Sequence, residues 1–166
     1  MILRASEFIR YGAAVNRHRA IDTPRVPRIG PYSQVVQVGD LLFVAGQPGI
    51  DPATSAVAGE TFEAQARQAF ANLRAALEDA GSGLERVVKT TCFVADPAAF
   101  PALNALYAEH FPSAPPVRST PIVQLPRGLL VSIEAIAVAG PARAKKRAAK
   151  TSAGSRGRRR ATRSRR

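Results

Sequence analysis

The sequence predicts an α+β domain in which two helices cover one face of a mixed β-sheet. Short apolar runs rich in Val, Ile and Phe alternate with two stretches whose apolar residues recur every three to four positions. The elements follow in the order ββαβαββ within about 120 residues. Several strands are apolar on nearly every residue, which indicates cover on both faces. Because the chain offers no third layer, we expect the uncovered face to meet other subunits.

The first half of the domain contains a hairpin followed by a helix. Strands are expected at residues 33–38 and 41–45, separated by the turn pair Gly39-Asp40. The helix is expected over residues 61–80, where Thr61 caps its start and the next residue after its end is a glycine. Its apolar stripe consists of Phe62, Ala66, Ala69, Phe70, Leu73, Leu77 and Ala80.

The second half repeats the strand and helix pattern and adds a pair of strands. A strand is expected over residues 87–95, and Asp96-Pro97 starts a helix that runs to Phe111. The inner face of that helix is predicted to hold Phe100, Leu103, Leu106 and Tyr107. Strands over residues 118–125 and 129–138 are expected to pair through a turn at Pro126-Arg-Gly.

The positive charge of the chain, formally +12 at pH 7, comes from its C-terminal end. Residues 141–166 contain 12 Lys and Arg and no acidic residue, whereas residues 1–140 contain 12 basic and 12 acidic residues. We therefore expect an N-terminal extension over 1–19, one domain over 20–140 and a disordered basic tail over 141–166. The tail would contact nucleic acid or other polyanions through phosphates, or would act only as a solubilising extension.

Other features of the sequence indicate in which cellular compartment the protein acts. Residues 1–19 are an amphipathic arm, a transit peptide, or the product of a start site placed too far upstream. No apolar run approaches the roughly 20 residues that span a bilayer. Cys92 is the one cysteine and is expected to be a buried, inert thiol, while His18 and His110 lack metal-ligand spacing. These features favour a soluble protein in a reducing, cytoplasmic setting, with no membrane partner and no metal.

Arg118 heads the predicted strand over residues 118–125 and is the first candidate for a binding site. A guanidinium keeps its charge on burial and presents a planar fork of donors that matches a carboxylate or phosphate. One interpretation is a bound small carboxylic acid. The other is an arginine at a sheet edge that reaches water or pairs with a local acid such as Glu134.

Seven segments in unbroken order carry a resemblance to a known family. They are IGPYSQ (29–34), FVAGQ (43–47), LEDAGSGL (77–84), VVKTTCFVAD (87–96), NALYAEHF (104–111), PPVRST (115–120) and VSIEAIAVAG (131–140). Together they resemble the Rid family of reactive-intermediate deaminases, also called the YjgF or L-PSP family. The resemblance implies a chorismate-mutase-like α+β fold and a homotrimer whose sheets line a central barrel, with active clefts between adjacent subunits.

The resemblance also implies a reaction. Members of the family hydrolyse enamine or imine products of pyridoxal-phosphate enzymes, such as 2-iminopropanoate and 2-iminobutanoate, to the 2-keto acid and ammonia. They use no cofactor. Such a reaction needs a clamp for the substrate carboxylate, a held water and donors for the departing nitrogen.

Site residues follow from the resemblance one at a time. Arg118 occupies the position of the carboxylate-clamping arginine, and Thr120 offers backbone groups to substrate or water. Tyr32 matches the tyrosine that walls the cleft, Asn104 an asparagine near the cleft, and Gly46-Gln47 a bend beside it. Judged from the residues alone, Tyr32 is a packed aromatic in a turn and Asn104 an exposed or capping polar residue.

The chain departs from the family pattern at three places. One is Ala45, which stands where many members have a serine before Gly-Gln. Ser132 stands where the catalytic deaminases usually have a glutamate that holds the attacking water, while Glu134 keeps the second glutamate of that motif. A hydroxyl is a far weaker base, and loss of a general base typically costs ~10²–10⁴ in rate. The interval from Arg118 to Leu125-Pro126 is one residue shorter and contains Pro121, which predicts a bulge or register change beside Arg118.

Three functions are consistent with these features. In a 2-imino acid deaminase, Arg118 clamps the carboxylate, Thr120 backbone groups and a water held by Ser132 serve the imine, and Tyr32 closes the wall. A trimeric small-carboxylate-binding or regulatory protein would use the same pocket without turnover, which Ser132 favours. A nucleic-acid-associated protein would act through the tail. Some family members are described as ribonucleases, but no His pair or metal constellation in this sequence supports RNA cleavage.

Overall fold

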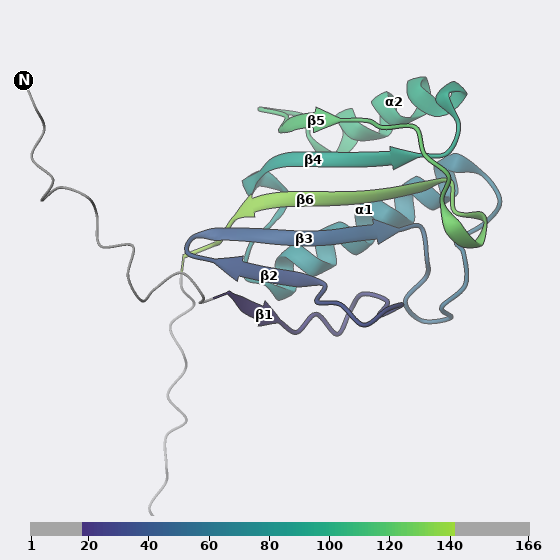
Figure 1. Ribbon diagram of the computed structural model, residues 1–166. Coiled ribbons are helices and arrows are strands. Elements are labelled where there is room, and N and C mark those ends of the chain that lie inside the picture. Colours follow the sequence, from purple (N-terminus) through teal and green to yellow (C-terminus); the bar gives the residue numbers. More distant parts are fainter. Residues whose placement is uncertain (1–17, 142–166) are drawn as a thin grey trace, which may run out of the picture.

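The computed structural model describes residues 18–141. Almost all of the predicted N-terminal extension (1–19) and of the predicted basic tail (141–166) therefore lies outside the described residues. The described part is a six-stranded mixed sheet with two α-helices packed on one face (Figure 1). This confirms the predicted α+β architecture.

The sheet has the strand order β1-β2-β3-β6-β4-β5, and all neighbouring strands are antiparallel except β4 and β5, which are parallel. The strands are β1 (Arg19–Ile21), β2 (Val35–Val38), β3 (Leu41–Pro48), β4 (Val87–Val94), β5 (Val117–Ser119) and β6 (Val131–Val138). The sequence did not predict β1, which adds a short edge strand beside β2. The sheet therefore contains one strand more than the predicted order.

The predicted pairing of the last two strands is wrong. The strand β5 is only three residues long and pairs with β4, while β6 lies between β3 and β4 in the middle of the sheet. Pro121 lacks a backbone N–H, so the ladder is interrupted soon after β5. The chain then crosses to the centre of the sheet through the short turn Pro126–Gly128, in which Arg127 has a φ of 61°.

The register change predicted beside Arg118 is also absent. Arg118 lies opposite Thr90, and the bridge between Val94 and Ile122 keeps the same offset along β4 as the three pairs of β5. Leu125-Pro126 lies after the ladder, in the crossing segment. Regular parallel pairing of β5 with β4 therefore determines which face of the sheet carries the Arg118 side chain.

The two helices begin and end close to the predicted positions. They are α1 (Phe62–Asp79) and α2 (Phe100–His110), the latter preceded by the 3₁₀ turn Pro97–Ala99. The Thr61 hydroxyl accepts a hydrogen bond from the backbone N–H of Ala64 at 3.2 Å, and Gly81 takes the left-handed conformation after α1, with φ 76°. An Asp96 carboxylate oxygen accepts from the N–H of Ala98 at 2.8 Å. These contacts confirm the caps that the sequence predicts.

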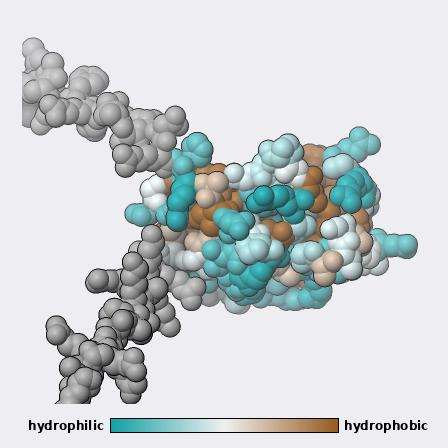
Figure 2. Space-filling view, turned by 90° about the horizontal axis from the view of Figure 1, so that it is seen from below, coloured by the Kyte–Doolittle hydropathy of each residue, from teal (hydrophilic) through white to brown (hydrophobic). Residues whose placement is uncertain are grey.

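The hydrophobic core lies between the helices and one face of the sheet, and the opposite face is open (Figure 1). Residues of β6 alternate between buried and half-buried, so that Ile133 faces the helices while Ser132 and Glu134 face the open side. Exposed apolar side chains on the open side include Val38, Leu41, Phe43 and Val138. Figure 2 shows hydrophobic patches among hydrophilic residues on the side of the molecule seen from below.

Arg25 anchors the extended segment that leads into β2. Its guanidinium donates to Asp79 Oδ1 at 2.7 Å, to Glu78 Oε2 at 3.0 Å and to the carbonyl oxygen of Ala75 at 3.2 Å. These acceptors lie at the C-terminal end of α1, where a cation also complements the helix dipole. The contact fixes the start of the segment that carries Tyr32.

Candidate functional site

Arg118 lies in the middle of β5 and its guanidinium is held by α2. Nη2 donates a hydrogen bond to Asn104 Oδ1 at 2.7 Å. The guanidinium carbon lies 4.7 Å from the centre of the Tyr107 ring and 5.4 Å from that of Phe100. No carboxylate in residues 18–141 lies within ion-pair distance of Arg118. The guanidinium is therefore positioned by neutral groups, and most of its donors are left for another acceptor.

The groups behind Arg118 are protonated and neutral at ordinary pH. The hydroxyls of Thr90 and Tyr107 share a hydrogen bond of 2.8 Å. Burial raises the pKa of Tyr107, which the hydrogen bond to Thr90 and the charge of Arg118 oppose. Burial likewise raises the pKa of the Cys92 thiol to about 11, so Cys92 is the buried, inert thiol that the sequence predicts. Neither group cancels the charge of Arg118.

One face of α2 supplies all three side chains around the guanidinium. Phe100, Asn104 and Tyr107 follow at four- and three-residue steps, which places them in one row. Phe100 was predicted to face the core, but it is 43% exposed and flanks Arg118 instead. The four- and three-residue spacing is the sequence signal that predicts these three side chains on one face of α2.

Ser132 lies beside Gly46 on the open face of the sheet. The ladder between β3 and β6 shifts register between Val44 and Gln47, which places Gly46 in a bulge. A Cβ at Gly46 would stand 2.8 Å from Ser132 Oγ. The absence of a side chain at residue 46 therefore leaves the room that the Ser132 hydroxyl occupies.

A chain of buried amides fixes this bulge. Gln47 Nε2 donates to Gln34 Oε1 at 3.1 Å and to the carbonyl oxygen of Ala45 at 3.0 Å. From the other side, Asn72 of α1 donates to the carbonyl oxygen of Pro48 at 2.9 Å. Gln34, Gln47 and Asn72 are all nearly inaccessible to solvent. The bend at Gly46 is thus tied both to the helix layer and to the segment that carries Tyr32.

The predicted site residues lie in three separate places that one protomer does not bring together. Arg118 and Asn104 lie on the helix side of the sheet at the β5 edge, with the half-buried Thr120 just beyond β5. Ser132 and Gly46 lie on the open side. Tyr32, which is 43% exposed, precedes β2, four strand spacings from β5, or roughly 19 Å.

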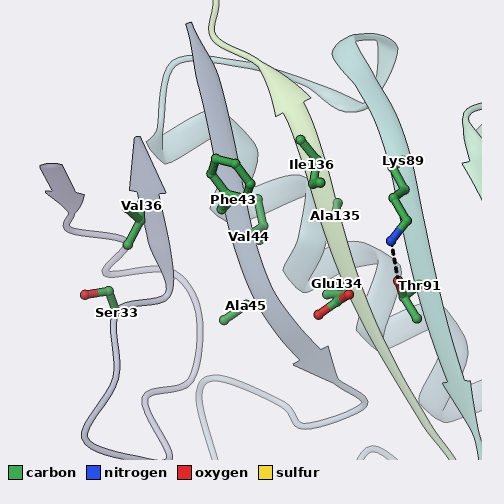
Figure 3. A pocket seen from close by; sticks show the side chains of 10 residues that line it. All are labelled: Ser33, Val36, Phe43, Val44, Ala45, Lys89, Thr91, Glu134, Ala135 and Ile136. Atoms are coloured by element: carbon green, nitrogen blue, oxygen red, sulfur yellow. Dashed lines mark hydrogen bonds between the residues drawn. The ribbon is translucent and has the colours of Figure 1, made fainter. Parts of the chain in front are cut away.

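The open face contains a hollow of about 330 Å³ that the sequence did not single out (Figure 3). Ser33, Lys89, Thr91 and Glu134 are its polar side chains, and Lys89 Nζ donates to Thr91 Oγ1 at 3.4 Å. Apolar side chains such as Phe43 surround them. Because Glu134 is on this face, it cannot pair with Arg118 of the same protomer, as one interpretation of the sequence suggested. The alternation of residues along β4 and β6 was the available signal.

Residues 18–141 contain neither a membrane-spanning helix nor a metal-binding cluster. None of the helices in this range is long and apolar enough to cross a bilayer. Between His18 and Pro141, no three His, Cys, Asp or Glu side chains are grouped so that they could hold a metal ion.

Comparison with solved structures gives close matches over most of the chain. RidA from an Antarctic Psychrobacter species has a TM-score of 0.69 at 38% identity, covering 72% of this chain and 98% of that chain. The YjgF gene product of E. coli has a TM-score of 0.67, also at 38% identity, with 72% and 98% covered.

Curated relatives match over the same region. A RutC family protein of Synechocystis is 43% identical over 124 residues, which is 72% of this chain and 95% of that protein. The 2-iminobutanoate/2-iminopropanoate deaminase of Mus musculus is 41% identical over 125 residues, or 74% and 93%. The model of the family described as endoribonuclease L-PSP matches residues 23–139. The chain therefore belongs to this family, the Rid/YjgF family that its motifs resemble.

Proposed function

We propose that this protein is a cofactor-independent deaminase that hydrolyses small 2-imino acids to 2-keto acids and ammonia. The observation that carries the proposal is the Arg118 guanidinium, half-buried, held by the neutral Asn104 and by two aromatic rings, with no carboxylate partner in residues 18–141. Such a group is suited to bind a carboxylate through two parallel hydrogen bonds. Relatives from Mus musculus and Dermatophagoides farinae, 41% and 40% identical, are named 2-iminobutanoate/2-iminopropanoate deaminases.

The chemistry needs only water and the residues of the chain. Arg118 holds the carboxylate and thereby fixes the imine carbon beside it. A water held by the Ser132 hydroxyl adds to that carbon, and its oxygen forms the new C–O bond. The carbon–nitrogen bond then breaks, and the protons of the water pass to the nitrogen, which leaves as ammonia. Backbone groups at Thr120 bind the substrate or the water.

The site is completed by a second copy of the chain in this proposal. Arg118 and Asn104 lie on one side of the sheet and Ser132 and Gly46 on the other, so one protomer separates the clamp from the water-holding group. We infer a homotrimer in which the open faces meet and Tyr32 of one subunit closes the cleft against Arg118 of the next. The apolar open face supports this arrangement, because large exposed apolar surfaces usually mark an interface.

The test generates 2-iminopropanoate in situ with a dehydratase and follows release of the keto acid. Wild-type protein is expected to accelerate release, and Arg118→Ala to lower kcat/KM by about a hundredfold, because two charge-assisted hydrogen bonds are lost. Arg118→Lys is the matched control: it keeps the charge without the fork, and a higher KM is expected. Release at the same rate with wild type and Arg118→Ala would contradict the proposal.

The second candidate is a trimeric protein that binds or senses a small carboxylic acid without turning it over. Ser132 favours it, since a hydroxyl activates water far less well than a carboxylate. The variant Ser132→Glu separates the two. Deaminase activity that appears only in Ser132→Glu would identify the natural protein as a binder, whereas activity already present in wild type supports the enzyme.

The basic C-terminal segment supports an additional proposal, namely contact with nucleic acid through phosphates. Residues 141–166 carry 12 basic residues and lie beyond the family match, which ends at residue 139. Binding would be independent of base sequence and would weaken steeply with salt. Deletion of residues 141–166 is expected to abolish the shift of a labelled duplex in a gel while leaving pyruvate binding unchanged. Retained duplex binding after the deletion would exclude the tail as its source.

A further inference from the structure

Arg118 has a long side chain whose position must be fixed before it can clamp a ligand. A free arginine side chain carries about 2 kcal/mol of rotamer entropy that binding would otherwise have to overcome. Asn104 supplies one hydrogen bond, but Asn104 is itself exposed and can move. A single bond to a mobile side chain is a weak restraint, so the aromatic rings beside the guanidinium are the remaining candidates.

Tyr107 is the more rigid of the two rings. It is 7% exposed, and its ring packs against Phe111 with ring centres 4.6 Å apart and against Phe70 at 6.2 Å. Its hydroxyl shares a 2.8 Å hydrogen bond with Thr90, a fully buried residue of β4. Phe100 is farther from the guanidinium and 43% exposed. Tyr107 thus connects the guanidinium to a fully buried residue of β4.

We propose that Tyr107 is a positioning residue for Arg118: its ring, tied by its hydroxyl to Thr90, fixes the guanidinium so that the unused donors face the carboxylate of the bound acid. This inference rests on the proposed function. A cation held near an aromatic ring keeps its full charge, whereas a carboxylate partner would neutralise it. The donor edge of the guanidinium is where a planar carboxylate fits.

Three variants separate the ring, the hydroxyl and general packing. Tyr107→Leu removes the ring, and Tyr107→Phe keeps the ring but loses the bond to Thr90. Phe111→Leu is the matched control, because it removes an aromatic ring from the same cluster without touching Arg118. Thr90→Val is a fourth variant that loosens Tyr107 without changing the ring, and it serves if Tyr107→Leu does not fold.

The first measurement is equilibrium binding of pyruvate, the keto acid product of 2-iminopropanoate, by calorimetry. Tyr107→Leu is expected to weaken binding roughly threefold to tenfold, which corresponds to the loss of a partly desolvated cation–π contact. Tyr107→Phe and Thr90→Val are expected to weaken it less, and Phe111→Leu, which keeps the Tyr107 ring and its bond to Thr90, least of all. In the deaminase assay the KM of Tyr107→Leu should rise by the same factor with kcat unchanged, since the interaction is equal in ground and transition states.

The second measurement is the NMR chemical shift of the Arg118 side-chain protons. The ring current of an aromatic ring at 4.7 Å changes that shift. The change in shift should be much smaller in Tyr107→Leu, where only the Phe100 ring at 5.4 Å remains, and should persist in Tyr107→Phe and Phe111→Leu. The inference is overturned if Tyr107→Leu binds pyruvate as tightly as wild type, or if Phe111→Leu weakens binding equally. If wild type itself neither binds pyruvate nor turns over imine, the proposed function fails, and the NMR shift alone then decides whether Tyr107 positions Arg118.

Discussion

Asn104 gives Arg118 a hydrogen-bond acceptor that carries no charge, and this choice of residue keeps the site cationic. An aspartate at the same position would have the same shape and would accept the same bond at 2.7 Å. It would also form an ion pair and remove the net charge that a substrate carboxylate needs. In the proposed function, binding of the acid at this scale depends on the difference between an amide and a carboxylate.

The variant Asn104→Asp tests this difference. Pyruvate binding is expected to weaken roughly tenfold, because the new carboxylate competes for the guanidinium through charge-assisted bonds. Asn104→Ala is the control: it removes the acceptor but leaves the charge, so a smaller loss is expected. Calorimetric titration of both variants provides the comparison, and equal affinity of Asn104→Asp and wild type would show that charge plays no part.

At the scale of elements, the bulge in β3 places Gly46 against the Ser132 side chain on the open face. Gly46 lies in this bulge and Gly49 directly follows β3, and the two glycines have different surroundings. A Cβ at Gly46 would meet only the Ser132 hydroxyl, at 2.8 Å, whereas a Cβ at Gly49 would stand 2.5 Å from the carbonyl oxygen of Gln65 and 2.6 Å from its Cα. A hydroxyl can rotate away, but the backbone of α1 cannot. The two positions therefore separate function from stability.

Alanine substitutions at these two glycines should change different properties of the protein. Gly49→Ala is expected to lower the free energy of unfolding by about 1–3 kcal/mol through overpacking against α1. Gly46→Ala should leave that free energy almost unchanged but displace the Ser132 hydroxyl and lower kcat. Urea unfolding together with the deaminase assay measures both. A large loss of stability in Gly46→Ala would show that the bend is a packing feature rather than part of the site.

The end of α2 makes stability depend on pH. The His110 ring stacks on Phe70 at 4.2 Å, and burial, followed by the nearby Arg74, lowers the pKa of His110 below its ordinary 6.5, although Glu109 opposes this and Arg67 adds to it. The unfolded chain therefore binds the proton first, and the free energy of unfolding falls as the pH drops below 6.5. Urea unfolding at about pH 5 and about pH 7.5 measures the slope. It should be reduced in His110→Gln, and an unchanged slope would assign the effect to another group.

The elements that the sequence predicted well are those with local signals. The two helices carried periodic apolar residues and caps at Thr61 and Asp96, and both were found where expected. The pairing of β5 with β4 and the central place of β6 were missed, because strand order depends on contacts between distant segments. Arg118 was predicted as a site residue from its motif, while its contact with Tyr107 could be found only from the packing of α2 against the sheet.

At the scale of the whole molecule, one face of the sheet remains apolar and open. Phe43 is 43% exposed on this face. A charged substitution at Phe43 tests whether this residue lies at a free surface or in an interface between subunits. Phe43→Asp should convert the proposed trimer to monomers, because burial of an unpaired carboxylate costs several kcal/mol. Ala71→Asp, on the exposed side of α1, is the control that should stay trimeric. Light scattering on a sizing column gives the mass, and an intact Phe43→Asp trimer would place the interface elsewhere.

The position of β6 also determines the order in which the chain can fold. This last strand of the domain lies between β3 and β4, so until it is made the sheet exists as two separate pieces with unpaired inner edges. Both pairings of β6 join distant parts of the chain, which slows folding, and unpaired edges invite association with other chains. A nascent chain that ends before residue 131 contains both helices and five of the six strands of the described domain. It is nevertheless prone to aggregate. Completion of the fold awaits the final eight-residue strand.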